Sequence, residues 1–301
     1  MNNFFLAINK RILFRYYNWL GKRNPQKLCS IRFRKCFGRD LNWDNPLDIN
    51  EKINWLKFNS DTSLWTTFAD KYLVRQYVEE KGFGDNLVKL YGRWSDANDI
   101  NWDSLPSSFV MKLNNGSGDA LICNNKNELD HKKVVKYFNR RIKKGFGYST
   151  AEPHYRGMIP CIIAEELLDV TRQPIKSCSL IDYKIWCFNG KPECVWACYD
   201  RTKTSVKVAT YDLEWNCHPE YSVYIGHYQK ADILIPKPKA LDKMLYMAAM
   251  LSQGFPQVRV DLYEVDNKPY FGEMTFTSNM GLMDFYTQDY LNYLGGKFCV
   301  K

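Results

Sequence analysis

The sequence lacks the patterns that turn cysteine and histidine into metal ligands or disulfides. None of the 10 cysteines forms a pair at zinc-knuckle spacing, and the 4 histidines are too far apart to complete such a site. Several cysteines lie inside apolar runs, where a thiol packs as a small hydrophobic group: Cys123, Cys161, Cys187 and Cys194. These absences exclude a zinc domain and a disulfide scaffold, and we expect reduced thiols in a cytoplasmic protein.

The sequence also has little that suits a membrane span or a secretion signal. Lys10, Arg11 and Arg15 interrupt the apolar opening stretch, so it is too short to cross a bilayer, and no small-residue cleavage site follows. Internal repeats and low-complexity segments are absent too. What is present is a globular composition, 45% hydrophobic and 25% charged over 301 residues, with apolar content for a substantial core.

All of the net positive charge lies at the N-terminus. Residues 1–40 contain ten Lys or Arg against Asp40 alone, a surplus that equals the +9 of the entire chain. Cations mixed with Phe, Tyr and Trp are typical of a helix in the interface of an anionic membrane. The alternative interpretation is a helix that docks on the protein body and exposes its cations to water. Nucleic acid is a third interpretation of a basic arm, but nothing downstream resembles a nucleic-acid reader, so we expect no such partner.

Hydrophobic periodicity predicts helices first and strands later, the order of an α+β protein. Residues 45–105 are expected to be helical, because Asp48 and Glu51 form a capping-box pattern and Gly82 ends a later helix. The elements expected after this region are strands at 108–113 and 120–123, a helix at about 127–144, strands at 161–168, 180–188, 193–199 and 207–213, a helix at about 239–253, and strands at 257–265 and 269–276.

The first candidate site element is the run FVMKLNNGSGDALIC. Lys112 lies near the end of one predicted strand, and Gly116, Ser117 and Gly118 form the turn that leads to the next. A lysine and free backbone N–H groups suit the binding of phosphates. The turn is not a Walker loop, because no Gly-Lys-Ser/Thr follows it, and a Gly-Ser-Gly turn by itself is more often a simple hairpin.

The second element is the hairpin VRVDLYEVDNKPYFGEMTF. With a three-residue loop at 266–268, Asp261 opposes Glu273, and the two carboxylates can share a Mg2+ ion that is bound to nucleotide phosphates. A two-residue loop would place the carboxylates on opposite faces. The alternative interpretation is a solvated face with a cross-strand repulsion, which the flanking Phe, Tyr and Val disfavour.

The third element joins IIAEELL to LIDYKIWCF. Glu165 and Glu166 follow an apolar strand, and Lys184 lies within the next one. An acidic residue at a linker between lobes can accept a hydrogen bond from ribose or adenine, and the lysine can reach a phosphate. Without the other two elements, these residues would be interpreted as a surface ion pair.

An ordered set of motifs resembles the TupA-like branch of the ATP-grasp superfamily, named for teichuronopeptide synthesis. The likeness runs from about Asn45 to about Leu282 and rests on NPLDINEKINWLK, ADKYLVRQYV, LPSSFVMKLNNGSGD, IIAEELL, DYKIWCFNGKP and VRVDLYEVDNKPYFGEMTF. It implies an α+β, ATP-grasp fold in which two α+β lobes clasp ATP. The implied parts are a basic aromatic arm (1–44), a helical subdomain (45–105), a central lobe with a Gly-rich lid (106–165) and a C-terminal lobe with a metal site (166–301).

The resemblance also implies a role for each matching residue. Arg259 and Lys184 would be the catalytic cations. The residues implied to contact ATP are Lys71, Lys112, Gly116, Ser117, Gly118, Glu165, Glu166, Leu167, Leu168 and Lys184. Asp261, Glu273 and Thr275 would hold Mg2+, although many ATP-grasp enzymes have Asn where Thr275 stands.

The implied activity is ATP-dependent ligation of a carboxylate to an amine through an acyl phosphate. The family implies a uronic acid of a surface polysaccharide, such as a capsule, or of its precursor, joined to an amino acid or another small amine. A metal-dependent glycosyltransferase of polysaccharide biosynthesis is the alternative, with Asp212-Leu213-Glu214 as its nearest acidic motif. A further alternative is a membrane-associated protein with an inactive nucleotide fold, which the intact set of charged residues disfavours.

Overall fold

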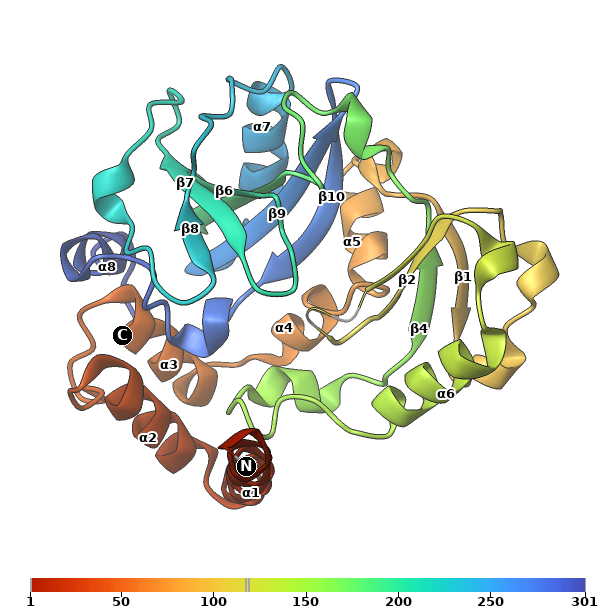
Figure 1. The fold of residues 1–301 in the computed structure, drawn as a ribbon. Helices are drawn as coiled ribbons and strands as arrows, with labels where there is room; N and C mark the ends of the chain where they lie inside the picture. The colour runs from red at the N-terminus through yellow and green to blue at the C-terminus, as the bar shows by residue number, and fades with distance from the viewer. Residues whose placement is uncertain (1, 117, 119, 301) are drawn as a thin grey trace.

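Two β-sheets form the framework of the protein in the computed structural model, which describes residues 2–116, 118 and 120–300, and only the backbone of residues 2–10 (Figure 1). The smaller sheet has the order β1-β4-β2-β3, and the larger has the order β10-β9-β5-β6-β7-β8. Neighbouring strands are antiparallel except for β7 and β8. The strands are β1 (Leu90–Trp94), β2 (Phe109–Leu113), β3 (Leu121–Cys123), β4 (Ile162–Glu165), β5 (Asp182–Phe188), β6 (Lys191–Tyr199), β7 (Val206–Tyr211), β8 (Tyr228–Lys230), β9 (Gln257–Val265) and β10 (Lys268–Thr275).

Helices surround the sheets and link them, with α4 and α5 between the two (Figure 1). Helix α6 packs on the small sheet, where Val134 and Phe138, one turn apart, join a buried cluster with Phe109. Helix α7 packs on β5, β6 and β9 of the large sheet. The helices are α1 (Asn2–Arg23), α2 (Pro25–Phe37), α3 (Ile49–Asn59), α4 (Ser63–Phe68), α5 (Val74–Glu80), α6 (His131–Ile142), α7 (Leu241–Leu251) and α8 (Gln288–Gly295).

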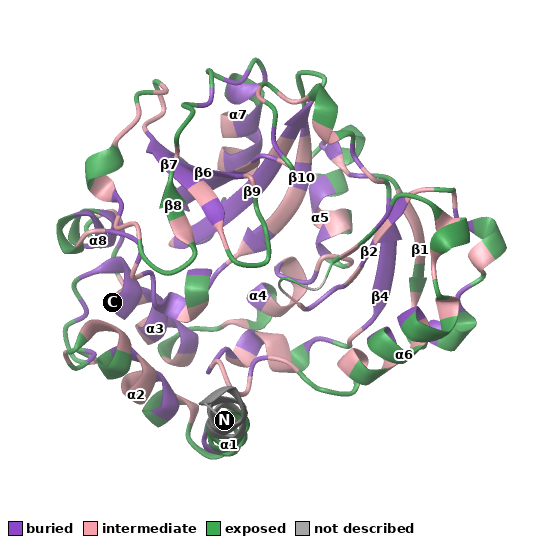
Figure 2. Ribbon diagram, viewed as in Figure 1, coloured by how far each residue is buried: buried purple, intermediate pink, exposed green. Residues whose placement is uncertain are grey.

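The principal hydrophobic core lies at the large sheet. Strand β5 is buried along almost its whole length, because α7 covers one of its faces while its neighbours β6 and β9 enclose its edges (Figure 2). Trp186 and Tyr183 are among the largest fully buried side chains. The small sheet has its own smaller core. Each lobe therefore has an independent apolar centre, and polar side chains can meet between them.

The strands predicted from the sequence are confirmed with small shifts at their ends, but three elements were missed. β1 lies in the region predicted to be helical throughout, and that prediction is wrong for residues 90–94. The sequence of β1 has no strict alternation of apolar and polar residues, because the strand is half-buried along most of its length rather than buried on one face and exposed on the other. β8 has three residues that are mostly exposed, and α8 follows a loop-like stretch, so neither has a strong periodic signal.

The start of α3 follows the predicted cap only in part. Asp48 accepts a hydrogen bond from the Glu51 backbone N–H at 2.9 Å, as expected. The Glu51 carboxylate does not return to Asp48 but accepts a hydrogen bond from the Leu47 backbone N–H at 2.9 Å. Arg39 forms ion pairs with both acids at 2.5 Å. The cap therefore ties the segment after α2 to the body of the protein.

The basic N-terminal arm forms two helices with different surroundings. Helix α2 buries Leu28 and Phe33 in a cluster that includes Leu282, so it docks on the protein body. Helix α1 leaves Ile12 60% and Trp19 50% exposed. Among the described residues, no helix combines the length and the apolarity that crossing a bilayer requires.

Candidate active site

The Gly-rich turn begins where β2 ends, and its base is fixed by polar contacts. The Asn114 side-chain amide donates a hydrogen bond to Asp70 at 2.5 Å, and the Asn114 carbonyl accepts one from the Lys71 backbone N–H at 3.1 Å. The Lys71 ammonium donates to the Gly116 carbonyl at 2.8 Å. Gly118 is exposed with a φ of +71°, whereas Ser117 lies outside the described residues. The predicted phosphate-binding turn and Lys71 are therefore neighbours in space.

Lys112 belongs to a charged cluster of the small lobe. Its ammonium pairs with Glu165 at 2.5 Å across the β2–β4 ladder. Arg75 of α5 pairs with the other oxygen of Glu165 at 3.3 Å and also donates to the Val88 carbonyl at 2.8 Å. Arg75 was not predicted as a site residue, because nothing in the helical pattern around it separates it from a surface arginine.

The segment at the end of β4 that is predicted to contact ATP has exposed and buried parts. Glu166 is exposed, and its backbone N–H donates to the Lys89 carbonyl at 2.9 Å. Leu167 is half-buried, and Leu168 is buried with Val88 and with Val265 at the end of β9. This apolar cluster joins the linker of the small lobe to the large sheet.

The hairpin of β9 and β10 pairs the two predicted metal carboxylates, but not through the predicted turn. Val265 pairs with Lys268, so the turn has two residues, Asp266 and Asn267, both with positive φ. A two-residue turn alone would place the carboxylates on opposite faces, and the prediction of a three-residue loop is wrong. A β-bulge between Phe271 and Glu273 shifts the register by one residue, so Asp261 still pairs with Glu273.

Gly272 makes this bulge possible. An ideal Cβ at this position would lie 2.9 Å from the Asp261 carbonyl oxygen and 3.1 Å from the Tyr263 ring. The absence of a side chain lets the bulged strand approach β9 closely. The glycine therefore decides which face of the hairpin carries Glu273.

Asp261 is the centre of a buried charge network in the large lobe. Arg259 forms a two-pronged contact with it, with Nε and Nη2 each 2.7 Å from a carboxylate oxygen. Lys184 of β5 lies 2.5 Å from the same carboxylate and also pairs with Asp182. Burial opposes the charge on Lys184, but Asp182 and Asp261 outweigh it and raise the pKa of the ammonium. Asp182 was not predicted, although it alternates with Lys184 along the strand.

Glu273 connects this network to the Gly-rich turn. Its carboxylate lies 3.0 Å from the Lys71 ammonium and accepts a hydrogen bond from the Thr275 hydroxyl at 3.2 Å. Burial alone would raise the pKa of Glu273, but Lys71, Lys184 and Arg259 lower it far below its ordinary value. The three cations therefore favour the charged form of this carboxylate.

The Tyr263 phenol is influenced by charged groups of both lobes. Burial, and then carboxylates from both clusters, raises the pKa of its phenol well above the ordinary value. The carboxylates are Asp182, Glu273 and Asp261 in the large lobe and Glu165 in the small one. The structure thus brings Lys71, Lys112, Lys184, Arg259, Asp261 and Glu273 to one region between the sheets.

The segment after β10 is held from two sides and touches Arg259. Ser278 accepts a hydrogen bond from Arg259 Nη1 at 2.5 Å. Three polar residues on one buried face of α3 bond the backbone of this segment: Asn50 with the Met283 N–H at 2.9 Å, Asn54 with the Gly281 carbonyl at 2.8 Å, and Lys57 with the Met280 carbonyl at 2.6 Å. Thr277 donates to the buried Glu152 at 2.5 Å. The NPLDINEKINWLK motif therefore positions a segment that contacts the site.

The donor groups suit a hard cation that shares its coordination with phosphate. No group of three or more His, Cys, Asp or Glu side chains in the described part of the chain is arranged to hold a metal alone. Asp261, Glu273 and the Thr275 hydroxyl offer only oxygen atoms, which Mg2+ prefers, and Mg2+ usually retains waters and substrate phosphates in its shell. The residues present fit such an ion.

The acidic motif of the alternative hypothesis lies outside this region. Asp212 accepts a hydrogen bond from the Asn216 side chain at 2.8 Å and contacts a His218 ring nitrogen at 3.2 Å. Glu214 is exposed. Asp212 therefore has a local structural role in the turn after β7.

Comparison with known proteins identifies the family. A model of the TupA-like ATP-grasp proteins matches residues 51–299. The chain belongs to the TupA-like ATP-grasp family. This confirms the predicted family and its ATP-grasp fold with two α+β lobes. No curated protein matches the sequence.

Solved structures with similar folds are distant from this TupA-like ATP-grasp protein. D-alanine–D-alanine ligase from Bacillus anthracis shares 14% identity over 77% of this chain and 60% of its own, with a TM-score of 0.41. L-amino acid ligase from Bacillus licheniformis shares 14% identity over 85% and 56%, with a TM-score of 0.45. D-alanine–D-alanine ligase from Helicobacter pylori shares 12% identity over 83% and 67%, with a TM-score of 0.42. The chain thus spans about 60% of the first of these proteins.

Proposed function

We propose that this protein is an ATP-dependent carboxylate–amine ligase. The observation that carries the proposal is the position of Lys71, which contacts both the Gly116 carbonyl in the Gly-rich turn and the Glu273 carboxylate. One side chain thus joins the predicted phosphate-binding turn to the predicted metal site. The membership of the family supports the same activity.

In the proposed reaction, a carboxylate oxygen of the acceptor attacks the γ-phosphorus of ATP, and ADP leaves. The amine nitrogen then attacks the carbonyl carbon of the acyl phosphate, the amine loses a proton, and inorganic phosphate leaves. Lys184 and Arg259 would neutralise the charge that builds up on the transferred phosphoryl group. Both are buried and held by Asp261, so they need no large reorganisation during the reaction.

The remaining predicted residues would bind the nucleotide. Lys71, Lys112, Gly116, Ser117 and Gly118 would contact its phosphates. Residues 165–168 would contact the nucleoside, with the acidic side chains on hydroxyl or amino groups and Leu167 and Leu168 on the base. Asp261, Glu273 and Thr275 would hold Mg2+, which supplies positive charge at the phosphates when it is bound.

We propose a uronic acid of a surface polysaccharide, or of its precursor, as the carboxylate and an amino acid or other small amine as its partner. The family resemblance supports the acidic glycan, and so does a basic N-terminal arm. The basic aromatic face of α1 supports a peripheral contact with an anionic membrane, at its cytoplasmic face. The parts of the chain would be 1–44, 45–105, 106–165 and 166–301. Strand β1 belongs to the second part by sequence but pairs with β4 in the small sheet.

Thermal unfolding with Mg2+ and ATP tests the proposal. ATP should raise the melting temperature of the wild type, and Asp261→Asn and Glu273→Gln should each lose most of this shift. A ligand at a hundred times its Kd stabilises by about 2.7 kcal/mol, so the shift is measurable even if the variants differ in basal stability.

The matched controls are Asp212→Asn and Glu214→Gln, which remove the same charge from the alternative motif. Both should keep the full response to ATP. A shift with a nucleotide sugar that disappears in these two variants, together with no shift with ATP, would support the glycosyltransferase instead.

A further inference from the structure

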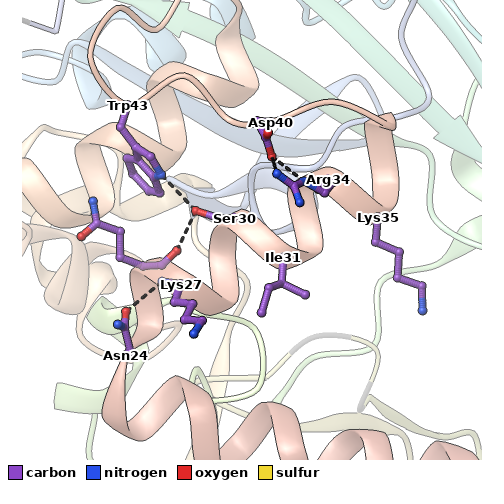
Figure 3. A pocket seen from close by; sticks show the side chains of 9 residues that line it. Asn24, Lys27, Ser30, Ile31, Arg34, Lys35, Asp40 and Trp43 are labelled. Carbon is purple, nitrogen blue, oxygen red and sulfur yellow. Dashed lines mark hydrogen bonds and ion pairs between the residues drawn. The ribbon is translucent and has the colours of Figure 1, made fainter.

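A basic hollow lies on the N-terminal helices, outside residues 51–299 that match the family model (Figure 3). It has a volume of about 770 Å3, within the range of roughly 300–1,000 Å3 for small-molecule sites. Its wall combines one face of α2 with the segment that leads from α2 to α3. The lining residues are Asn24, Gln26, Lys27, Ser30, Ile31, Arg34, Lys35, Asp40 and Trp43.

Trp43 is a fixed aromatic wall of this hollow. Its indole N–H donates to the Ser30 hydroxyl at 3.0 Å, and its ring packs edge-on against Phe58 with 5.9 Å between the ring centroids. The side chain is half-buried, so part of the ring is open to a ligand. A ring that is held in place binds a flat ligand face with little loss of side-chain entropy.

The cations of the hollow exceed its acids. Arg34 pairs with Asp40, and both are 67% exposed. Lys27 and Lys35 are exposed and have no ion pair among the described residues. Asn24 uses its side-chain oxygen to cap α2, accepting from the Lys27 backbone N–H at 2.9 Å, which leaves its amide N–H groups for a ligand. The hollow therefore offers two uncompensated ammonium groups beside amide donors and an aromatic face.

These groups together match the chemistry of a sugar acid. The C–H face of a sugar ring packs on an indole, its hydroxyls bond amide groups, and its carboxylates pair with lysines. A simple inorganic anion would use the cations but not the aromatic wall. We propose that the hollow binds a short stretch of an acidic oligosaccharide, a polyuronate, at a site separate from the nucleotide site. The choice of a uronate over other anionic sugars rests on the proposed function.

Helix α2 links this hollow to the segment that contacts Arg259. Arg32 points from the other side of α2 and donates to Met280 Sδ at 3.1 Å and to the Ser149 carbonyl at 2.8 Å. A polymer held on α2 would therefore remain close to the catalytic lobe. Such tethering raises the effective concentration of the acceptor, so each polymer could be modified several times before it leaves.

Isothermal titration calorimetry of the full chain without nucleotide tests the inference. The probe is hexagalacturonate, with maltohexaose as the neutral oligosaccharide and phosphatidylglycerol vesicles as the anionic lipid. The wild type should bind hexagalacturonate and not maltohexaose. The double variant Lys27→Gln/Lys35→Gln should bind about tenfold more weakly, because two charge contacts are lost. Trp43→Ala should also bind more weakly, provided that its melting temperature stays close to that of the wild type.

The matched control is Lys132→Gln/Lys136→Gln, which removes two exposed cations from α6 and should bind like the wild type. Equal binding by the α2 lysine variant and the wild type, or no binding of hexagalacturonate, would overturn the inference. Binding to vesicles but not to hexagalacturonate, if the α2 lysine variant loses it, would assign the hollow to lipid and overturn the inference too. The response to Mg2+ and ATP, measured on the same samples, reports separately on the proposed ligase.

Discussion

At the scale of single residues, the lysines of the site already have carboxylate partners before any nucleotide arrives. Lys112 pairs with Glu165, Lys71 with Glu273, and Lys184 with Asp261. Charges buried without a partner would cost several kcal/mol each, so this pairing lets the site hold many charges in a stable protein. To contact Lys112 and Lys71, nucleotide phosphates would then have to displace Glu165 and Glu273.

His154 provides a test of how buried polar groups near the site affect stability. It is 2% exposed, and neither ring nitrogen has a partner. Burial, and then the charge of Lys57, lowers its pKa from 6.5 to about 3. Since the unfolded chain binds a proton below pH 6.5 and the folded protein does not, the free energy of unfolding should fall between pH 6.5 and about 3, by at most about 1.4 kcal/mol per pH unit.

Urea unfolding at a series of pH values measures this dependence. His154→Gln cannot take up the proton, so its stability should fall less steeply with decreasing pH than that of the wild type. Glu152, whose pKa burial raises, is present in both proteins and cancels from the comparison. Parallel pH profiles for the two proteins would contradict the prediction.

At the scale of elements, the site depends on two segments that are forced into unusual backbone paths. After β10, Asn279, Met280 and Gly281 all have positive φ, and the polar face of α3 holds them there. Left-handed conformations of non-glycine residues persist only where the surroundings fix them. The bulge at Gly272 is the second such segment, and it sets the position of Glu273.

Gly272→Ala should damage both the fold and the site. The added methyl group would meet the Asp261 carbonyl and the Tyr263 ring, so we expect a loss of about 1–3 kcal/mol in the free energy of unfolding. The shift of the melting temperature by ATP should shrink as well, because Glu273 would move relative to Asp261. Gly84→Ala is the control, since its new methyl group would meet only Glu79 Cγ at an ordinary 3.5 Å. Similar behaviour of the two variants would argue against a special role for the bulge.

At the scale of the whole molecule, the two lobes meet through charged and apolar contacts. Lys71 reaches from the α4–α5 connection to both the small-lobe turn and β10, and the cluster of Val88, Leu168 and Val265 closes the linker side. Helix α2 extends this unit, whereas Phe14, Tyr16 and Trp19 of α1 are exposed. The N-terminal helices therefore differ in what they can bind.

The exposed face of α1 should bind anionic membranes. Arg11→Gln/Arg15→Gln and Trp19→Ala in the full chain should each reduce partitioning into phosphatidylglycerol vesicles, the first by removing charge and the second by removing an interfacial anchor. Sedimentation with vesicles measures this, with phosphatidylcholine vesicles as the neutral comparison. Point variants are preferable to deletion before Asn45, because deletion would uncover the cluster around Leu282. Unchanged partitioning of both variants would exclude a membrane role for α1.

Much of the site could be predicted because its residues lie on strongly patterned strands. Lys112, Lys184 and Asp261 alternate with apolar residues, so strand periodicity places each of them on the face of its strand opposite its apolar neighbours. Arg75 and Ser278 could not be found in this way, since their roles come from contacts between segments distant in the sequence. Strand β1 was missed for a related reason: it is stabilised by pairing with β4 rather than by its own pattern.

The bulge also has a consequence for how this hairpin can diverge. A three-residue turn without a bulge and a two-residue turn with one give the same carboxylate pair, with the same number of residues between Asp261 and Glu273. In related proteins, the extra residue can therefore lie either in the turn or in the β10 bulge, without any change in the length of the hairpin. A two-residue turn without a bulge would give the same carboxylate pair with one residue fewer between the acids, because the bulge accounts for one residue. Among relatives with a two-residue turn, the spacing of the two acids should therefore differ by one residue between hairpins with the bulge and hairpins without it.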